Sequence, residues 1–215
     1  MTQSRAMTWA WRSTAAGLVA VWLGLLAASA LAGGEAAEAL MARLQPLESM
    51  TARFVQQVTD AEGQLLQEGS GQMAAQRPHR MRWSTEEPFH YLVVTDGQWL
   101  WRYDADLEQA NREPFDETLT DAPGLLFGED PQRLVERYTV RRQGEGFVLE
   151  PHSPRAPFRR LELHWAGPAL QAMILVDRLD QTTRIEFEEV RINPELAAGQ
   201  FEFTPPEEAD VILHD

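Results

Sequence analysis

The sequence of 215 residues contains no cysteine, and this absence excludes several kinds of chemistry. Without thiols the chain can form no disulfide, no thiolate nucleophile and no cysteine-ligated zinc or iron–sulfur site. A lipoprotein precursor also needs a cysteine at its cleavage point, so we expect a mature protein that carries no lipid of its own.

Lysine is absent as well, because all 19 basic residues are arginine. Schiff-base lysines, a pyridoxal phosphate linkage and a Walker-type phosphate loop are thereby excluded. The 33 acidic residues give a net charge of −14. Such a surface repels nucleic acid and anionic lipid headgroups, so we expect no nucleic-acid partner.

Catalytic patterns are also scarce. The five histidines are scattered, with no pair at the close spacing of a metal motif: His79, His90, His152, His164 and His214. Carboxylates are plentiful enough to supply a glycosidase pair, but runs of charge in an acidic protein are usually solvated faces. No Gly-x-Ser-x-Gly nucleophile elbow occurs. We therefore predict no catalytic residue, no metal, no cofactor and no enzyme activity.

The N-terminus has the pattern of a secretory signal peptide. Arg5 and Arg12 precede an apolar run at residues 15–32, which ends in the small-residue pattern Ala30-Leu31-Ala32. This predicts cleavage of residues 1–32 and export to the periplasm, with residues 28–30 as a second cleavage motif. A permanent membrane anchor is the alternative. Residues 33–215 then form a single domain with a substantial core.

Beyond the signal peptide, apolar spacing predicts one helix and then many strands. The helical spacing spans residues 35–50, with Pro46 bending or ending the helix. Two short helices surround Pro123 and Pro131. Alternation predicts strands at 52–60, 64–76, 79–84, 89–97, from Trp99 onward, 138–143, 146–151, 158–166, 170–178, 182–192 and 200–206. About eleven strands with three short helices indicate a large antiparallel sheet with helices on one face, and such sheets tend to curl.

An aromatic stripe stands out among these strands. Trp99, Trp101 and Tyr103 occupy every second position, so their rings share one side of a strand. That side is either an ordinary core or an apolar surface kept for a ligand that is not protein, and alternation alone does not decide which.

Four segments, in this order, resemble the LolA family of periplasmic lipoprotein carriers: "RPHRMRW", "DGQWLWRYDADLEQ", "DRLDQTTRIEFEEVRIN" and "FEFTPPEEADVI". The resemblance extends from about Leu40 to Ile212. It implies a mainly β, α+β fold: an unclosed, strongly curved antiparallel β-barrel of about eleven strands, with a hydrophobic cavity covered by three short helices. Two departures are Met81, where the family commonly has an aromatic residue, and the lid segment "TDAPGLLF", with a displaced Pro123 and an added Gly124.

The resemblance also implies a site. Arg77 corresponds to the family's arginine that hydrogen-bonds lid carbonyls and holds the empty carrier closed. We predict that the acyl-chain cavity is lined by Met81, Trp83, Trp99, Trp101, Leu125 and Leu126. A thioether at Met81 suits an adaptable apolar lining.

The function implied is that of a monomeric periplasmic chaperone for lipoprotein acyl chains. It would receive lipoproteins from an inner-membrane ABC transporter, LolCDE, and deliver them to an outer-membrane receptor, LolB. The alternatives are a soluble lipid- or lipoprotein-sensing module of the same fold and a structural scaffold with a solid core.

Overall fold

The computed structural model describes residues 34–116, 122–128 and 130–214. Twelve strands form one sheet within them, in the order β12-β6-β5-β4-β3-β2-β1-β11-β10-β9-β8-β7. Their bounds are β1 (Ser49–Thr59), β2 (Leu65–Gln76), β3 (Arg80–Glu87), β4 (Tyr91–Thr95), β5 (Trp99–Asp104), β6 (Gln109–Pro114), β7 (Tyr138–Gln143), β8 (Gly146–Pro151), β9 (Phe158–Ala166), β10 (Ala169–Asp177), β11 (Thr182–Ile192) and β12 (Asp210–Leu213).

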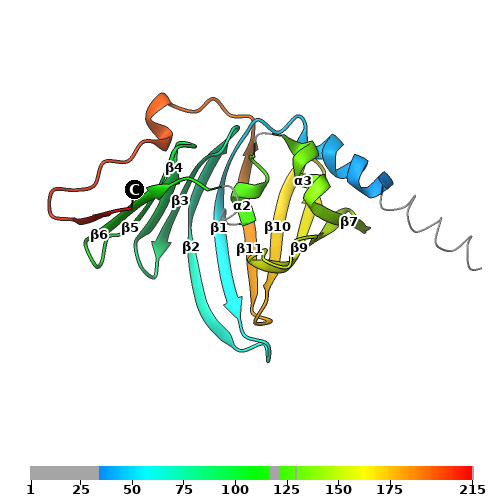
Figure 1. Cartoon of the computed structure of the whole chain (residues 1–215), viewed down its shortest axis with the longest axis horizontal. Helices are drawn as coiled ribbons and strands as arrows, with labels where there is room; N and C mark the ends of the chain where they lie inside the picture. The colour runs from blue at the N-terminus through cyan, green and yellow to red at the C-terminus, as the bar shows by residue number, and fades with distance from the viewer. Residues whose placement is uncertain (1–33, 117–121, 129, 215) are drawn as a thin grey trace, which may run out of the picture.

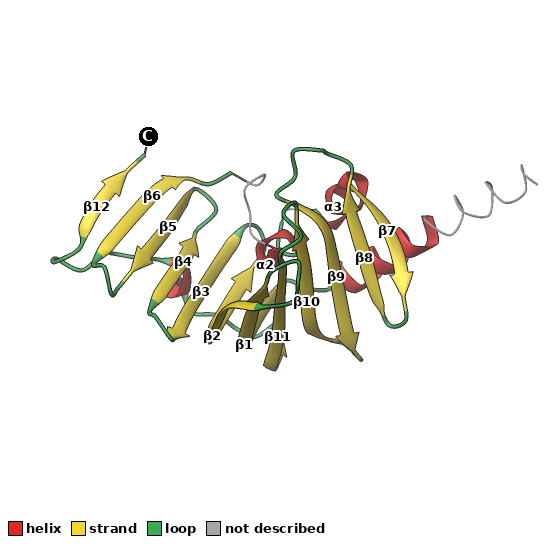
Figure 2. Cartoon of the chain, turned by 90° about the horizontal axis from the view of Figure 1, so that it is seen from below, coloured by secondary structure: helices red, strands yellow, loops and turns green. Residues whose placement is uncertain are grey.

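The sheet is strongly curved and does not close. Its edge strands, β12 and β7, lie at opposite ends of the strand order and are far apart when the sheet is viewed from below (Figure 2). All neighbouring strands pair antiparallel except β12, which runs parallel to β6. The predicted fold class, an unclosed antiparallel sheet with a few helices, is confirmed.

Helices cover the inner face of the curve. Residues 34–44 form the N-terminal helix, and α2 (Ala122–Leu125) and α3 (Pro131–Arg137) lie in front of the sheet in Figure 1. Arg43, near the end of the N-terminal helix, donates a hydrogen bond to the carbonyl oxygen of Gly167 at 2.6 Å. This bond fixes the helix to the turn between β9 and β10.

The N-terminal helix is shorter than the predicted span of 35–50. It ends at residue 44, two residues before Pro46, and Met50 already belongs to β1. Proline excludes residue 45 from helical geometry by crowding its backbone, which accounts for the early end. Met50 is nonetheless buried, since β1 directs it into the same core as the helix.

Two strands were missed and one prediction was wrong. The short polar strand β6 and the parallel strand β12 have weak alternation, so neither was predicted. The predicted strand at 200–206 contains the end of a 3-10 helix, η2 (Ala198–Phe201), and irregular chain. Phe201 is buried and Phe203 packs against aromatic rings, so their alternation comes from packing and not from strand pairing.

The main core fills the inner side of the curved sheet. Leu40 and Leu44 of the N-terminal helix, Leu126 and Phe127 after α2, and Leu134 of α3 pack against it. The strands contribute alternate residues, in keeping with the period of two. They are Met50, Ala52, Phe54, Met73, Ala75, Met81, Trp83, Val93, Leu100, Val140, Phe147, Leu149, Phe158, Leu161, Leu163, Trp165, Leu170, Met173, Ile185 and Phe187.

The described residues contain no helix that is both long and apolar enough to span a bilayer. The predicted signal peptide, residues 1–32, lies outside the described residues.

A glycine lets β2 approach β3 closely at a register shift between Ser70 and Gly71. A Cβ at Gly71 would lie 1.9 Å from the carbonyl oxygen of Ser84. We expect Gly71→Ala to lower the free energy of unfolding by about 1–3 kcal/mol, because the backbone must shift to relieve the overlap. Urea denaturation measures this change.

The control is Gly34→Ala, whose added Cβ would meet no atom within 4 Å. Equal unfolding free energies for the two variants would contradict the close approach of β2 and β3.

Candidate functional site

Strand register decides which side chains face the inside of the curve. Met81 of β3 pairs with Thr95, and Trp83 pairs with Val93. Met81, Trp83 and Val93 belong to the main core, and the ring of Trp83 stacks on Phe54 at a centroid distance of 3.7 Å. The predicted lining residues Met81 and Trp83 therefore lie on the inner face.

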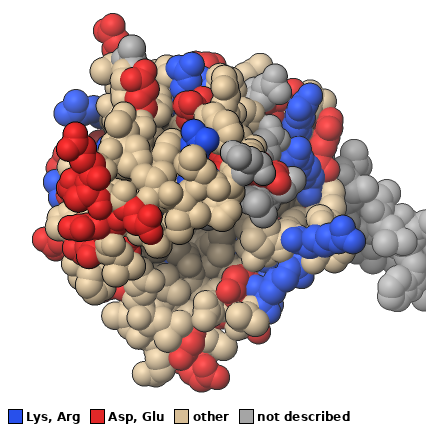
Figure 3. Space-filling model, turned by 60° about the vertical axis from the view of Figure 1, so that its left-hand side comes forward, with Lys and Arg blue, Asp and Glu red and all other residues tan. Residues whose placement is uncertain are grey.

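A cavity of about 370 Å³ opens on this inner face, between β3–β4 on one side and β10–β11 on the other. Its apolar wall includes Met81, Trp83, Val93, Leu175 and Ile185. The remaining lining residues include polar groups and exposed rings: Gln56, Gln67, Thr85, Pro88, Phe89, Tyr91 and Thr183. Figure 3 shows a surface hollowed near its centre, with mostly uncharged walls and acidic side chains gathered to one side.

The lid, defined here as residues 122–128, closes the other part of the inner face. Leu126 and Phe127 are each 1% exposed, and Leu125 also packs against the core. Only about 20 Å³ remains in the pocket between Phe127, Gly124 and strands β3–β5. The lid thus sits on a well-packed core, and the open space lies beside it.

Arg77 connects the lid to the sheet. It follows the last residue of β2, and its Nη2 donates a hydrogen bond to the carbonyl oxygen of Leu126 at 2.8 Å. The backbone amide of His79 adds a second bond, to the carbonyl oxygen of Phe127 at 2.9 Å. Two successive lid carbonyls are therefore held by the turn between β2 and β3.

The environment of Arg77 is partly buried. Desolvation lowers its pKa from the ordinary value, while the carboxylates of Glu48 and Asp130 act in the opposite direction. Guanidinium remains charged at physiological pH despite such a shift. Its buried Nε has no hydrogen-bond partner among the described residues. The bond to Leu126 is thus a charge-assisted one in a partly dry setting, which strengthens it.

The structure does not place Trp99 and Trp101 with the lining, so that prediction is corrected. Leu100 takes the inner side of β5, and the two tryptophans point to the outer face. There the guanidinium of Arg112 lies 4.2 Å from the ring centroid of Trp99. Phe203 contacts the ring of Trp101 at 5.6 Å, so the C-terminal segment covers this stripe.

Tyr103 completes this second cluster, with its ring 5.4 Å from that of Phe203. The aromatic stripe of β5 is therefore a half-buried cluster between the sheet and the segment after η2. A period of two shows that these rings share a face but not which face is concave.

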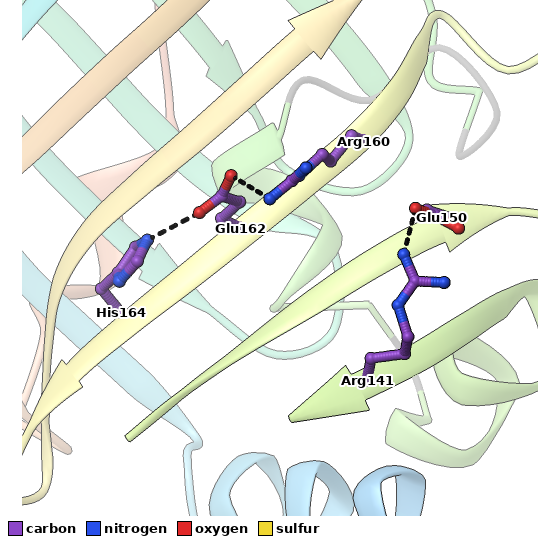
Figure 4. Close-up of polar contacts among 5 residues, drawn as sticks. All are labelled: Arg141, Glu150, Arg160, Glu162 and His164. Atoms are coloured by element: carbon purple, nitrogen blue, oxygen red, sulfur yellow. Dashed lines mark hydrogen bonds and ion pairs between the residues drawn. The ribbon is translucent and has the colours of Figure 1, made fainter. Parts of the chain in front are cut away.

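The outer face of β7–β9 carries ion pairs. Glu162 of β9 lies between Arg160, at 2.7 Å, and His164, at 3.2 Å, while Arg141 of β7 pairs with Glu150 of β8 (Figure 4). Ion pairs of this kind along strands contribute little to stability. They mark the side of β7–β9 that faces water.

Among the described residues, no group of histidine, aspartate and glutamate is arranged to hold a metal ion. The site is built instead from apolar walls, a lid and one arginine. Such an arrangement can enclose an apolar ligand.

Residues 45–204 match the family model described as outer membrane lipoprotein carrier protein LolA. The chain belongs to this family. The resemblance predicted from the four sequence segments is confirmed.

Two relatives named outer-membrane lipoprotein carrier protein match this protein over most of its length. The one from Chromohalobacter salexigens is 40% identical over 191 residues, covering 87% of this chain and 90% of the relative. The one from Azotobacter vinelandii is 38% identical over 193 residues, covering 86% and 93%. These identities support a lipoprotein carrier role.

A solved structure shares the fold at low identity. An uncharacterized conserved protein from Thermus thermophilus superposes with a TM-score of 0.50 and 16% identity, covering 83% of this chain and 99% of that chain. This likeness concerns the fold alone.

Sequence reasoning missed several residues of the cavity wall. Val93, Leu175 and Ile185 line it, and Phe89 stands at its edge. Ile185 and Phe187 occupy alternate positions of β11, so the sequence pattern places them on one face of the strand, and the pairing of β11 with β1 makes that face the inner one.

The bond from Arg77 predicts a measurable effect on lid opening. A hydrogen bond to a charged group contributes about 1.5–3 kcal/mol. We expect Arg77→Gln to accelerate hydrogen exchange at the Phe127 amide, which bonds to Gly124 at 3.1 Å, by about tenfold or more. Exchange followed by mass spectrometry or NMR measures it.

Arg80→Gln is the matched control, since Arg80 is exposed and its bond to Gln76 is 3.4 Å long. If both variants exchange at the wild-type rate in the lid, Arg77 does not hold it closed.

Proposed function

We propose that this LolA-family protein binds the acyl chains of lipoproteins at its inner face and carries them through the periplasm. The observation that supports it most is the continuity of the apolar cavity wall with a core whose cover is a short hydrogen-bonded lid. Such a function needs no catalytic group and no cofactor.

Transfer free energies explain why a carrier is needed. An acyl chain of about 16 carbons loses roughly 12 kcal/mol on leaving a bilayer for water, at about 0.8 kcal/mol per methylene. No multiply acylated protein crosses an aqueous compartment at a useful rate against such a cost. A carrier must supply a comparable apolar environment and must also release its cargo.

A movable lid satisfies both requirements. In the closed form Leu126 and Phe127 are withdrawn from water, which avoids an exposed apolar patch. The space of about 370 Å³ is at the lower end of the range for small-ligand pockets, so several acyl chains require the lid to move aside. Cargo then shifts the equilibrium between the closed and open lid, because it binds the open form more tightly than the closed form.

Arg77 is proposed as the latch of this equilibrium. Its bond to Leu126 stabilises the empty closed form and is lost when the lid moves away. One hydrogen bond stabilises the closed form by only a small free energy, so bound cargo can still favour the open form. Uptake and release of cargo both require this small difference between the closed and open forms.

The proposed route follows from the family and from the predicted signal peptide at residues 1–32, which directs export. The donor would be the inner-membrane transporter LolCDE, the acceptor the outer-membrane receptor LolB, and the carrier a monomer. A sensing module of the same fold would bind lipid without extracting lipoproteins from a membrane.

Filling the cavity should strongly reduce cargo uptake. Leu175 lines the cavity, whereas its neighbour Ile174 pairs with Glu162 and Arg184 on the outer face. We expect Leu175→Trp to reduce the release of outer-membrane lipoproteins from spheroplasts by about tenfold or more, because the larger ring occupies acyl-chain space. Ile174→Trp, the matched control, should release them as the wild type does.

Equal release by both tryptophan variants would contradict cavity binding. If the wild-type protein binds a fluorescent fatty acid but releases no lipoprotein, the result favours a sensing module.

Loss of the latch should impair cargo hand-over. We expect Arg77→Leu to transfer lipoprotein to acceptor membranes carrying the receptor at least several-fold more slowly, since the closed form no longer competes with bound cargo. A variant that accepts and passes on lipoprotein at wild-type rates would refute the role of Arg77.

A further inference from the structure

A second groove, of about 380 Å³, lies on the outer face and is separate from the inner cavity. It crosses β11, β1, β2 and β3, and Gln200 of η2 stands at its side. Arg191, Thr51, Ala74 and Arg82 follow one another across the four strands in register. The small side chains of Thr51 and Ala74 thus form a floor between two arginines.

Three arginines line this groove, and two of their side chains have no hydrogen-bond or ion-pair partner within the part of the chain that the structure describes. The side chains of Arg53 and Arg191 form no hydrogen bond or ion pair with any described residue, and the side chain of Arg82 makes a 3.4 Å contact with the carbonyl oxygen of Glu202. Glu188 lies opposite Arg53 in the β1–β11 register, but these side chains form no ion pair.

The unpaired side chains of Arg53 and Arg191 contrast with several other arginines of the sheet. It has 33 acidic residues for 19 arginines, and elsewhere on the sheet Arg102, Arg160 and Arg184 each pair with a glutamate. Guanidinium groups offer paired donors that match the geometry of carboxylate and phosphate. The guanidinium groups of Arg53 and Arg191 over a floor of small side chains therefore favour an anionic ligand.

Two glutamates restrict what that ligand can be. Glu86 and Glu189 also line the groove, and Glu86 accepts a hydrogen bond from Nε2 of Gln72 at 2.9 Å. They repel a highly charged anion but accept hydrogen bonds from hydroxyl or amide groups. The neutral side chains of Ser84 and Thr51 add donors and acceptors along the floor.

We propose that the outer groove binds a polar ligand with a carboxylate or phosphate group held by Arg53 and Arg191, and with hydroxyl or amide donors facing Glu86 and Glu189. The sheet separates this site from the inner cavity, so both can be occupied at once. The volume is within the range of small-ligand sites.

Isothermal titration calorimetry of the purified protein tests this with two probes. N-acetyltriglycine offers one carboxylate with amide donors, and glucose 6-phosphate offers one phosphate with hydroxyl donors. We expect at least one probe to bind, and the one that binds identifies the anion. Each of Arg53→Gln and Arg191→Gln should weaken binding by about tenfold, as loss of a charge-assisted bond predicts, and added salt should weaken it further.

Arg155→Gln is the matched control, because Arg155 is exposed in the turn between β8 and β9, away from the groove. The proposal is overturned if neither probe binds, or if Arg155→Gln weakens binding as much as the groove variants do. Circular dichroism establishes that each variant is folded. Release of lipoproteins from spheroplasts should be unchanged in all three variants, so failure here and failure of the proposed carrier function are distinguishable.

Discussion

The apolar inner face of a curved, unclosed sheet is the feature on which the rest of the structure depends. Each strand directs every second side chain inward, and the curvature brings those side chains toward one another. An open sheet cannot cover this surface by itself. The N-terminal helix, α2 and α3 therefore lie across it, and without them a large apolar area would face water.

The covers differ in the length of their helices. The N-terminal helix buries Leu40 and Leu44 completely and is fixed through Arg43 to the β9–β10 turn. The lid contains a helix of only four residues, α2, and its links to the β2–β3 turn include the Arg77 side chain and the His79 backbone amide. A helix of four residues has few backbone hydrogen bonds of its own, so it opens at lower free energy than the longer N-terminal helix. The lid is therefore the element suited to open for cargo.

The fold could be predicted largely because strand alternation is a local property. Ten of the twelve strands followed from a period of two, whereas β6 is short and polar and β12 depends on pairing with a strand distant in sequence. The orientation of β5 could not be predicted, since Trp99 and Trp101 alternate with Leu100 whichever face is concave. Packing decides it: Phe203, about 100 residues later, covers the tryptophan side. Arg77 was predicted from a family resemblance, and its contact with Leu126 needs three-dimensional proximity that local patterns do not contain.

Photocrosslinking tests the binding of acyl chains at the inner face most directly. A lipoprotein whose acyl chains carry a photoreactive group is loaded onto the protein and irradiated, and the modified residues are identified by mass spectrometry. The account predicts modification at inner-face residues such as Met81, Val93 and Ile185. Modification confined to the outer-face stripe of Trp99 and Trp101, or equal labelling of both faces, would contradict it.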